Sequence, residues 1–297
     1  MRVLIVGVGY VGLPLGAELV RQGHEVHGLR RSAALFEALR HAGIQPLIAD
    51  ISRAETLAAL PNDFDWVVNC AATGGGSVAD YQRLYHDGTR NLIAWLSPAF
   101  ARRPAARYLY TSSTGVYGQN DGSLVDEASP AEPASETARV LVETERALLT
   151  AATENKFPAL ILRAAGIYGP ERGYLLRQFL SDEARIEGEG TRILNMIHRD
   201  DLISAIIATL TRGQPGEIYN ATDDEPVSQL AFFTWLAAKL GKPLPPVAAR
   251  QADDSRRRGL TSKRISNRKL RTELGCALKF PTFREGYAAE IARLGLA

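Results

Sequence analysis

The chain of 297 residues is 45% hydrophobic, enough to bury a substantial core as one large domain or as a domain with a smaller lobe. Its formal net charge of +2 argues against a dedicated nucleic-acid binder, which would be far more basic. The two cysteines, Cys70 and Cys276, indicate free thiols in a reducing compartment rather than a disulfide framework. No apolar run reaches the roughly 18 residues of a membrane span, and the first predicted strand leaves no room for a signal peptide. We therefore expect a soluble, cytoplasmic protein without a membrane partner.

A glycine-rich turn follows the first predicted strand. Residues 3–6 form an apolar run typical of a buried parallel strand, and residues 13–22 predict a helix. Between them the sequence reads G-x-G-x-x-G, in which the first glycine permits a tight turn, the second lets the backbone approach a pyrophosphate, and the third lets the helix pack closely. The helix N-terminus would then face the phosphates. We predict a dinucleotide site here, formed by Gly7, Gly9, Tyr10, Val11 and Gly12.

The second predicted strand, residues 25–29, ends at a basic pair. An acidic residue at this place would bind the ribose 2′-hydroxyl of NAD. The sequence has Arg30, Arg31 and Ser32 instead, which suit a 2′-phosphate through charge-assisted hydrogen bonds. The alternative is a solvated basic pair that opens the next helix. We expect NADP(H) as the cofactor in preference to NAD.

Three further strands are predicted at residues 46–51, within 64–72, and at 107–113, alternating with helical stretches. This alternation predicts an α/β fold with a Rossmann-type, doubly wound parallel sheet. A long helix is expected over 81–96, ending near Pro98. The residues after these strands would line the cofactor: Asp50, Ile51, Ala71, Ala72, Thr111 and Ser112.

Five motifs in order carry a family resemblance. The hydroxyl-rich strand end 112–115 runs into Val116-Tyr117-Gly118, and the other four motifs are Gly88-Thr89-Arg90-Asn91-Leu92, the segment Arg163 to Pro170, Ile197-His198-Arg199-Asp200-Asp201-Leu202, and Tyr219-Asn220. The chain resembles the extended short-chain dehydrogenase/reductases, the NAD-dependent epimerase/dehydratase group that acts largely on nucleotide sugars. The opening glycine turn also resembles nucleotide-sugar 6-dehydrogenases, but Cys276 has no comparable setting and the chain is short for their second large domain.

The resemblance implies a division of the chain and a set of roles. Residues 1–170, with 191–220 returning, would form the NAD(P)-binding domain, and 171–190 with 221–297 a smaller substrate lobe. Ser113 would help to position the substrate oxygen, while Arg163 and Ala164 would contact the cofactor. The substrate would be a small molecule similar to a nucleotide sugar, and a basic run at 256–264 could hold its anionic part or could be solvated. Relatives often dimerise through the helices expected at 81–96 and 133–152. No metal site is expected.

The chain departs from the family at the catalytic pair. Members carry a Tyr and, four residues later, a Lys on one helix, where the tyrosine exchanges a proton with the substrate. Here Thr137 and Leu141 occupy those places, with Glu145 matching the acidic residue that follows. There is no Tyr or Lys between Gly118 and Lys156, so no shift of register restores the pair.

Two functional hypotheses remain open. In the first, the protein is an NADP(H)-dependent oxidoreductase or an epimerase/dehydratase-like enzyme in which another group, such as Tyr117, transfers the proton. Tyr168, His198 and Glu143 are weaker candidates, each with a structural alternative as packing residue, local hydrogen-bonding residue or solvated surface residue. In the second, the protein is a catalytically silent NADP-binding regulator or sensor.

Overall fold

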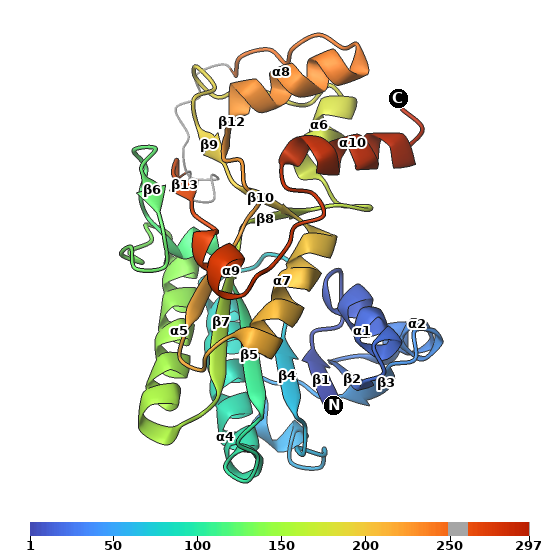
Figure 1. Ribbon diagram of the computed structural model, residues 1–297, viewed down its shortest axis with the longest axis vertical. Helices are drawn as coiled ribbons and strands as arrows, with labels where there is room; N and C mark the ends of the chain where they lie inside the picture. Colours follow the sequence, from blue (N-terminus) through green and yellow to red (C-terminus); the bar gives the residue numbers. More distant parts are fainter. Residues whose placement is uncertain (249–260, 297) are drawn as a thin grey trace. The chain divides into compact units, whose positions relative to one another are not determined.

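The computed structural model describes residues 1–248 and 261–296. Its main element is a seven-stranded parallel sheet flanked by helices, with the strand order β11-β7-β5-β4-β1-β2-β3 (Figure 1). The order reverses between β1 and β4, which is the doubly wound arrangement of a Rossmann fold. The predicted fold class is therefore confirmed. The strands are β1 (Arg2–Val6), β2 (Glu25–Arg30), β3 (Gln45–Ile48), β4 (Trp66–Asn69), β5 (Arg107–Ser113), β7 (Ala159–Ala164) and β11 (Ile218–Ala221).

The chain folds into two compact units. The first comprises Met1–Val116, Glu136–Arg163 and Ile206–Tyr219, and the second comprises Tyr117–Ser135, Ala164–Ala205 and Asn220–Ala297. Helices of the first unit include α1 (Gly12–Arg21), α2 (Phe36–His41), α3 (Val78–Tyr81), α4 (Gly88–Phe100) and α5 (Glu136–Asn155), together with the π-helical segment η3 (Gln82–Asp87) and the short 3-10 turns η1 (Ala33–Leu35), η2 (Ala54–Thr56) and η4 (Thr114–Val116). Helix α7 (Arg199–Arg212) begins in the second unit and ends in the first.

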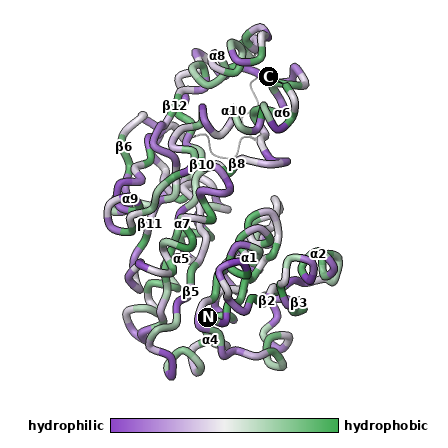
Figure 2. The backbone as a smooth tube through the Cα atoms, turned by 45° about the vertical axis from the view of Figure 1, so that its right-hand side comes forward, coloured by the Kyte–Doolittle hydropathy of each residue, from purple (hydrophilic) through white to green (hydrophobic). Residues whose placement is uncertain are grey.

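The core of the first unit explains why its strands are continuously apolar. Val3, Leu4 and Ile5 of β1 are completely buried, because helices cover both faces of the sheet. On one face, Tyr108 and Tyr110 of β5 pack with Leu92 of α4 and Leu148 of α5, among others. On the other face, α1 buries Leu15 and Leu19 and leaves charged residues outside, and Figure 2 shows this mixture of hydrophobic and hydrophilic residues along the helix.

The helix expected over 81–96 is longer and less regular than predicted. Helical backbone runs without interruption through α3, η3 and α4, from Val78 to Phe100. The expected end near Pro98 is wrong, because Pro98 lies inside the last turn of α4. Helix α5 likewise begins at Glu136, three residues after the predicted start at Pro133.

The second unit has its own aromatic core. Helices α6 (Tyr174–Leu180), α8 (Gln229–Leu240) and α10 (Phe283–Arg293) contribute buried rings such as Phe179, Phe233 and Tyr287. Phe232 is also buried and Trp235 packs against this cluster, so α8 supplies much of the core of this unit. The remaining elements are β6 (Leu124–Val125), β8 (Gly166–Tyr168), β9 (Ile193–Leu194), β10 (Met196–His198), β12 (Val227–Ser228), β13 (Arg264–Ile265) and α9 (Arg268–Glu273). Of the basic run at 256–264, residues 256–260 lie outside the described part of the chain.

Candidate functional site

The glycine turn lies where the strand order of the sheet reverses. Strand β1 pairs in parallel with β2 on one side and with β4 on the other. The connections from β1 and β4 therefore leave in opposite directions, and ligands of open α/β sheets bind at the carboxyl ends of such strands. Residues 7–12 follow β1 directly at this edge.

The geometry of the turn explains why each of these three positions is a glycine. Gly7 has a φ of +86°, and a Cβ added to it would lie 2.5 Å from the Cα of Ala71, so the loop after β4 touches the turn. A Cβ on Gly12 would lie 2.6 Å from the carbonyl oxygen of Gly7, so α1 packs directly on the turn. A Cβ on Gly9 would meet none of the described residues within 4 Å. The backbone at Gly9 therefore has room around it. The N-cap residue of α1 is Val11, whose apolar side chain cannot cap the helix, so this edge offers space and N–H groups to an anion.

Arg30 is fixed against this turn. It ends β2, and its Nη1 donates a hydrogen bond of 2.6 Å to the carbonyl oxygen of Val8. Because the guanidinium has five N–H donors, one bond to Val8 leaves others for a ligand. Arg31 and Ser32 follow with exposed side chains. The structure thus brings Arg30 of the predicted basic pair next to the glycine turn.

The residues after β3 and β4 lie at the same edge. The carboxylate of Asp50 accepts hydrogen bonds from the backbone and hydroxyl of Ser52, and the carbonyl of the buried Ile51 accepts one of 2.9 Å from Asn91 Nδ2. Ala71 is half-buried and Ala72 is exposed. All four residues follow strands of the parallel sheet at the edge where the turn lies, and of the four Ala71 contacts the turn at Gly7.

Strand β5 ends in hydroxyl groups that have different partners. Thr111 Oγ1 donates 2.9 Å to the carbonyl of Asn69 on β4, which ties the two strand ends together. Ser112 Oγ donates 2.5 Å to Glu145 Oε1 on α5. Ser113 Oγ accepts 3.0 Å from the backbone N–H of Gly115. Because the Ser113 hydroxyl acts as an acceptor in this bond, its proton can be donated to a substrate oxygen.

Glu145 and Arg163 form a buried ion pair behind this strand end. The Arg163 side chain is 4% exposed and that of Glu145 is 2% exposed, and Arg163 Nη2 lies 2.6 Å from Glu145 Oε2. Arg163, which the resemblance places among the cofactor contacts, therefore has its guanidinium inside the protein. The pair fastens α5 to β7 and, through Ser112, to β5.

Helix α5 carries Thr137 and Leu141, the two residues that the resemblance places at the positions of the family pair. Leu141 is buried, and Thr137 is half-buried at the start of the helix. Val140 and Leu148 are also buried, and Leu148 belongs to the core over the sheet. This part of α5 therefore buries apolar side chains against the sheet.

In the second unit, Tyr117 is completely buried and hydrogen-bonded. Its hydroxyl donates 2.9 Å to Asn220 Oδ1, and its carbonyl accepts 2.7 Å from Lys263 Nζ. Lys263 also donates 2.6 Å to Thr261 Oγ1, and burial lowers its pKa to about 8. The sequence placed Lys263 only within the basic run 256–264, because its neighbour Tyr117 is 146 residues distant and no local pattern connects them.

Ala164 and Tyr168 belong to the same unit and are buried. The Tyr168 ring stacks on Tyr287 at a centroid distance of 4.3 Å. Its hydroxyl lies where Gly286 leaves room, because a Cβ on Gly286 would collide with it. Burial raises the pKa of Tyr168 far above its ordinary value. Tyr168 therefore packs, as its structural alternative predicted, and a buried phenol of this kind is a poor proton donor at neutral pH.

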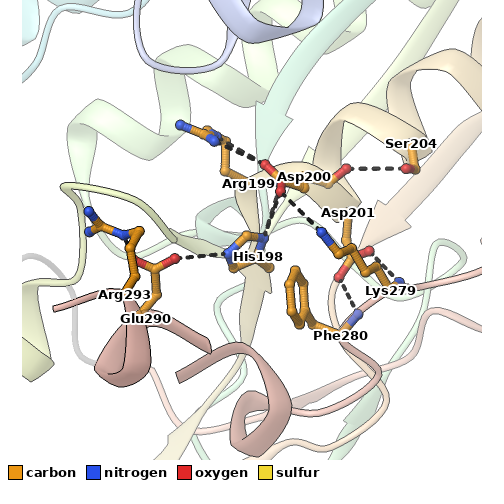
Figure 3. Close-up of polar contacts among 9 residues, drawn as sticks. All are labelled: His198, Arg199, Asp200, Asp201, Ser204, Lys279, Phe280, Glu290 and Arg293. Atoms are coloured by element: carbon orange, nitrogen blue, oxygen red, sulfur yellow. Dashed lines mark hydrogen bonds and ion pairs between the residues drawn. The ribbon is translucent and has the colours of Figure 1, made fainter. Parts of the chain in front are cut away.

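His198 is part of a polar cluster at the start of α7 (Figure 3). Its Nδ1 accepts a hydrogen bond of 3.2 Å from the backbone N–H of Asp200, and its Nε2 lies 3.5 Å from Glu290 Oε1 of α10. Asp201 accepts from the backbone N–H groups of Lys279 at 2.6 Å and Phe280 at 3.0 Å. Burial lowers the pKa of His198. The local hydrogen bond expected for His198 is confirmed, and the cluster joins α7 to the C-terminal segment.

The sheet order and the glycine turn at its switch point define an α/β protein of the Rossmann type. Residues 3–222 match the NAD dependent epimerase/dehydratase family, and the chain belongs to that family. The resemblance to extended short-chain dehydrogenase/reductases is therefore confirmed.

Relatives align over nearly the whole chain. Protein YeeZ of Escherichia coli (strain K12) is 29% identical over 288 residues, which cover 94% of this chain and 96% of the relative. A solved structure from Methylobacillus flagellatus, of a protein provisionally assigned as an NAD-dependent epimerase/dehydratase, is 33% identical with a TM-score of 0.78, covering 99% and 98% of the two chains. The dTDP-glucose 4,6-dehydratase of Bacillus anthracis str. Ames, solved in complex with NAD, has a TM-score of 0.81 over 99% and 96% of the chains at 19% identity, which shows a shared fold.

The described residues contain neither a membrane-spanning helix nor a cluster of metal ligands. No helix in this part of the chain is long and apolar enough to cross a membrane. Among residues 1–248 and 261–296, no group of three or more His, Cys, Asp or Glu side chains is arranged to hold a metal ion.

Proposed function

We propose that this protein binds NADP(H) at the glycine turn and acts as an oxidoreductase or an epimerase/dehydratase-like enzyme on a sugar-derived or other small polar substrate. The observation that carries the proposal is the turn itself. Gly9 leaves open space above the backbone, and Arg30 is held at the same turn by Val8. A dinucleotide pyrophosphate fits the open space at Gly9, and a 2′-phosphate fits the guanidinium of Arg30.

The protein's own residues divide the work. Residues 7–12 hold the pyrophosphate, and Arg30 with Arg31 and Ser32 holds the 2′-phosphate. Ala71 and Ala72 leave room for the cofactor over the ends of the strands. Ser113 donates a hydrogen bond from its hydroxyl group to the substrate oxygen and so holds the reacting carbon in position. When bound, the nicotinamide supplies or accepts a hydride.

The substrate class rests on the relatives. The dTDP-glucose 4,6-dehydratase relatives are named for a nucleotide sugar, and a UDP-glucose 4-epimerase of the same fold was solved with UDP-glucose. Within the proposal, this chain takes a substrate of that kind in the cytoplasm. A homodimer through α4 and α5 remains part of the proposal, although Leu148 of α5 faces the core and takes no part in such an interface. Sedimentation at two protein concentrations tests the dimer.

Gly9→Ala tests the site with little effect on folding. Because an added Cβ meets none of the described residues within 4 Å, the variant should unfold at the same urea concentration as the wild type. Its methyl group would occupy the space for the pyrophosphate, so NADPH affinity measured by calorimetry should fall by about tenfold or more. Gly173→Ala, whose added Cβ would make ordinary contacts of 3.6 Å with Leu176 and 3.7 Å with Tyr287, is the matched control. Unchanged NADPH affinity in Gly9→Ala would place the cofactor elsewhere.

A second function is favoured by one observation. Helix α5 presents Leu141 where the family has its lysine, and the Tyr117 hydroxyl already donates to Asn220. A protein that binds NADP(H) without turnover, as a regulator or sensor, would have this arrangement. Repeated NADPH oxidation with a defined product eliminates this alternative.

A further inference from the structure

The first unit contains a phenol that the family pattern does not assign, on the helix next to α5. Residues Gln82–Asp87 form a π-helical segment between α3 and α4. Such segments are rare, occur inside α-helices and are frequent at functional sites. This one carries Tyr85, and it packs directly against α5, the helix that lacks the tyrosine and lysine.

Tyr85 reaches the loop that follows β4. Its hydroxyl oxygen accepts a hydrogen bond of 3.3 Å from the backbone N–H of Thr73. Thr73 comes directly after Ala71 and Ala72, and Ala71 touches the glycine turn at Gly7. Strand β4 lies between β1 and β5 in the sheet, so the loop after it lies between the glycine turn and the end of β5. The phenol is therefore held at the edge where the cofactor and substrate are proposed to meet.

Tyr85 packs against the buried cluster that contains Tyr110 of β5, the strand that ends in the serines. Burial raises the pKa of Tyr110 well above its ordinary value, and the neighbouring Glu145 and Tyr85 oxygens raise it further. Glu145 in turn accepts the hydroxyl of Ser112, the residue next to Ser113. Tyr85 is half-buried, unlike Tyr108, Tyr110 and Tyr117, which are completely buried. Tyr85 therefore keeps part of its surface in contact with solvent.

We propose that Tyr85 is the proton-transfer residue of this protein, supplied by η3 in place of a tyrosine on α5. This inference rests on the proposed NADP(H)-dependent function. In the direction of reduction, Tyr85 gives its phenol proton to the substrate oxygen as hydride from the reduced nicotinamide adds to the carbonyl carbon. The electron pair of the C=O π bond moves onto that oxygen, and Ser113 hydrogen-bonds to it. The phenolate is stabilised by the N–H of Thr73 and regains a proton from solvent.

The test compares Tyr85→Phe with Tyr81→Phe. The Tyr81 ring lies 5.0 Å from that of Tyr85 and is also half-buried, which makes it a matched control. Phenolate formation is followed by ultraviolet difference absorbance across a pH series, without nucleotide and with saturating NADP⁺. The positive charge of the oxidised nicotinamide stabilises a nearby phenolate. We expect NADP⁺ to move the titration of one phenol per chain to lower pH in the wild type and in Tyr81→Phe, and this shift to be lost in Tyr85→Phe.

Each outcome decides the inference. A shift that persists in Tyr85→Phe, or no shift in a wild type that binds NADP⁺, overturns the role of Tyr85 and leaves the cofactor site standing. If the wild type binds neither NADP⁺ nor NADPH, both the proposed function and the role of Tyr85 are overturned. With phenanthrenequinone as the carbonyl probe, Tyr85→Phe should lower kcat by about 100-fold or more while NADPH affinity stays within about twofold. Equal kcat in Tyr85→Phe and Tyr81→Phe would contradict the proposal.

Discussion

The side chain of Glu145 joins three elements at the carboxyl edge of the sheet. It lies on α5, accepts from Ser112 of β5 and pairs with Arg163 of β7. A buried ion pair contributes little net stability compared with apolar residues, but removing one partner leaves an uncompensated buried charge. At the residue scale, the Glu145–Arg163 ion pair therefore helps to orient the end of β5, which carries the serines, without taking part in the proposed reaction.

Glu145→Gln should destabilise the protein strongly. It removes the charge that compensates Arg163, and the expected loss is about 3 kcal/mol of unfolding free energy. Urea unfolding followed by circular dichroism measures this loss. Glu143→Gln, on the exposed side of the same helix, is the control and should stay within about 0.5 kcal/mol of the wild type. Equal unfolding midpoints for the two variants would contradict the proposed role of the pair.

Asp223 predicts a pH dependence of stability. It is 2% exposed, its Oδ2 has no hydrogen-bond partner among the described residues, and burial raises its pKa from 3.8 to about 8. Because the folded state holds this proton more tightly than the unfolded state, the contribution of Asp223 to stability is full below about pH 4 and is lost as the pH rises through about 8. Asp223→Asn should remove this decline. The difference in unfolding free energy between variant and wild type should therefore grow between pH 5 and pH 8, as measured in urea; a constant difference would show that Asp223 does not titrate there.

At the scale of elements, the local sequence pattern predicted where helices and strands lie better than it predicted their lengths or their regularity. Strand β5 spans Arg107–Ser113 as predicted, because its apolar run is bounded by a polar turn on each side. The helix from Val78 to Phe100 was predicted too short, because Pro98 fits within its last turn. The π-helical segment η3 has no recognisable signature in the sequence, so no local pattern singled out Tyr85.

The C-terminal helix α10 has a capping box that should be measurable. Thr282 Oγ1 accepts from the backbone N–H of Arg284 at 3.1 Å, and Glu285 bonds back to the N–H of Thr282 at 2.9 Å. Thr282→Ala should lower the unfolding free energy by about 1 kcal/mol, because it leaves an N–H of the first turn without a partner. Thr234→Ala, at an exposed position within α8, should cost less. If the two substitutions cost the same, the cap contributes nothing beyond an ordinary helix hydroxyl.

At the scale of the whole molecule, the sequence alone could propose the parts of the site that consist of consecutive residues. The glycine turn, the basic pair and the hydroxyl-rich strand end are each contiguous, and the parallel sheet brings them to one edge. Contacts between distant residues could not be foreseen in the same way. The Ser112–Glu145–Arg163 group and the bond from Lys263 to the carbonyl of Tyr117 arise only after the chain has folded. These contacts occupy the Ser112 hydroxyl and the Arg163 guanidinium, which the sequence analysis assigned to the cofactor site. Other polar groups of that site remain available to a ligand.

The central claim is that this chain binds NADP(H) through its glycine turn and basic pair, and calorimetric titration with NADPH and NADH tests it most directly. We expect the wild type to prefer NADPH, because Arg30 and Arg31 each add a charge-assisted hydrogen bond to the 2′-phosphate. The double variant Arg30→Ala/Arg31→Ala should lose about 10- to 100-fold in NADPH affinity and leave NADH affinity unchanged. Arg40→Ala, an exposed arginine of α2, should behave as the wild type. Equal affinity for the two nucleotides would contradict the 2′-phosphate site, and binding of neither would contradict the account of the glycine turn as a working dinucleotide site.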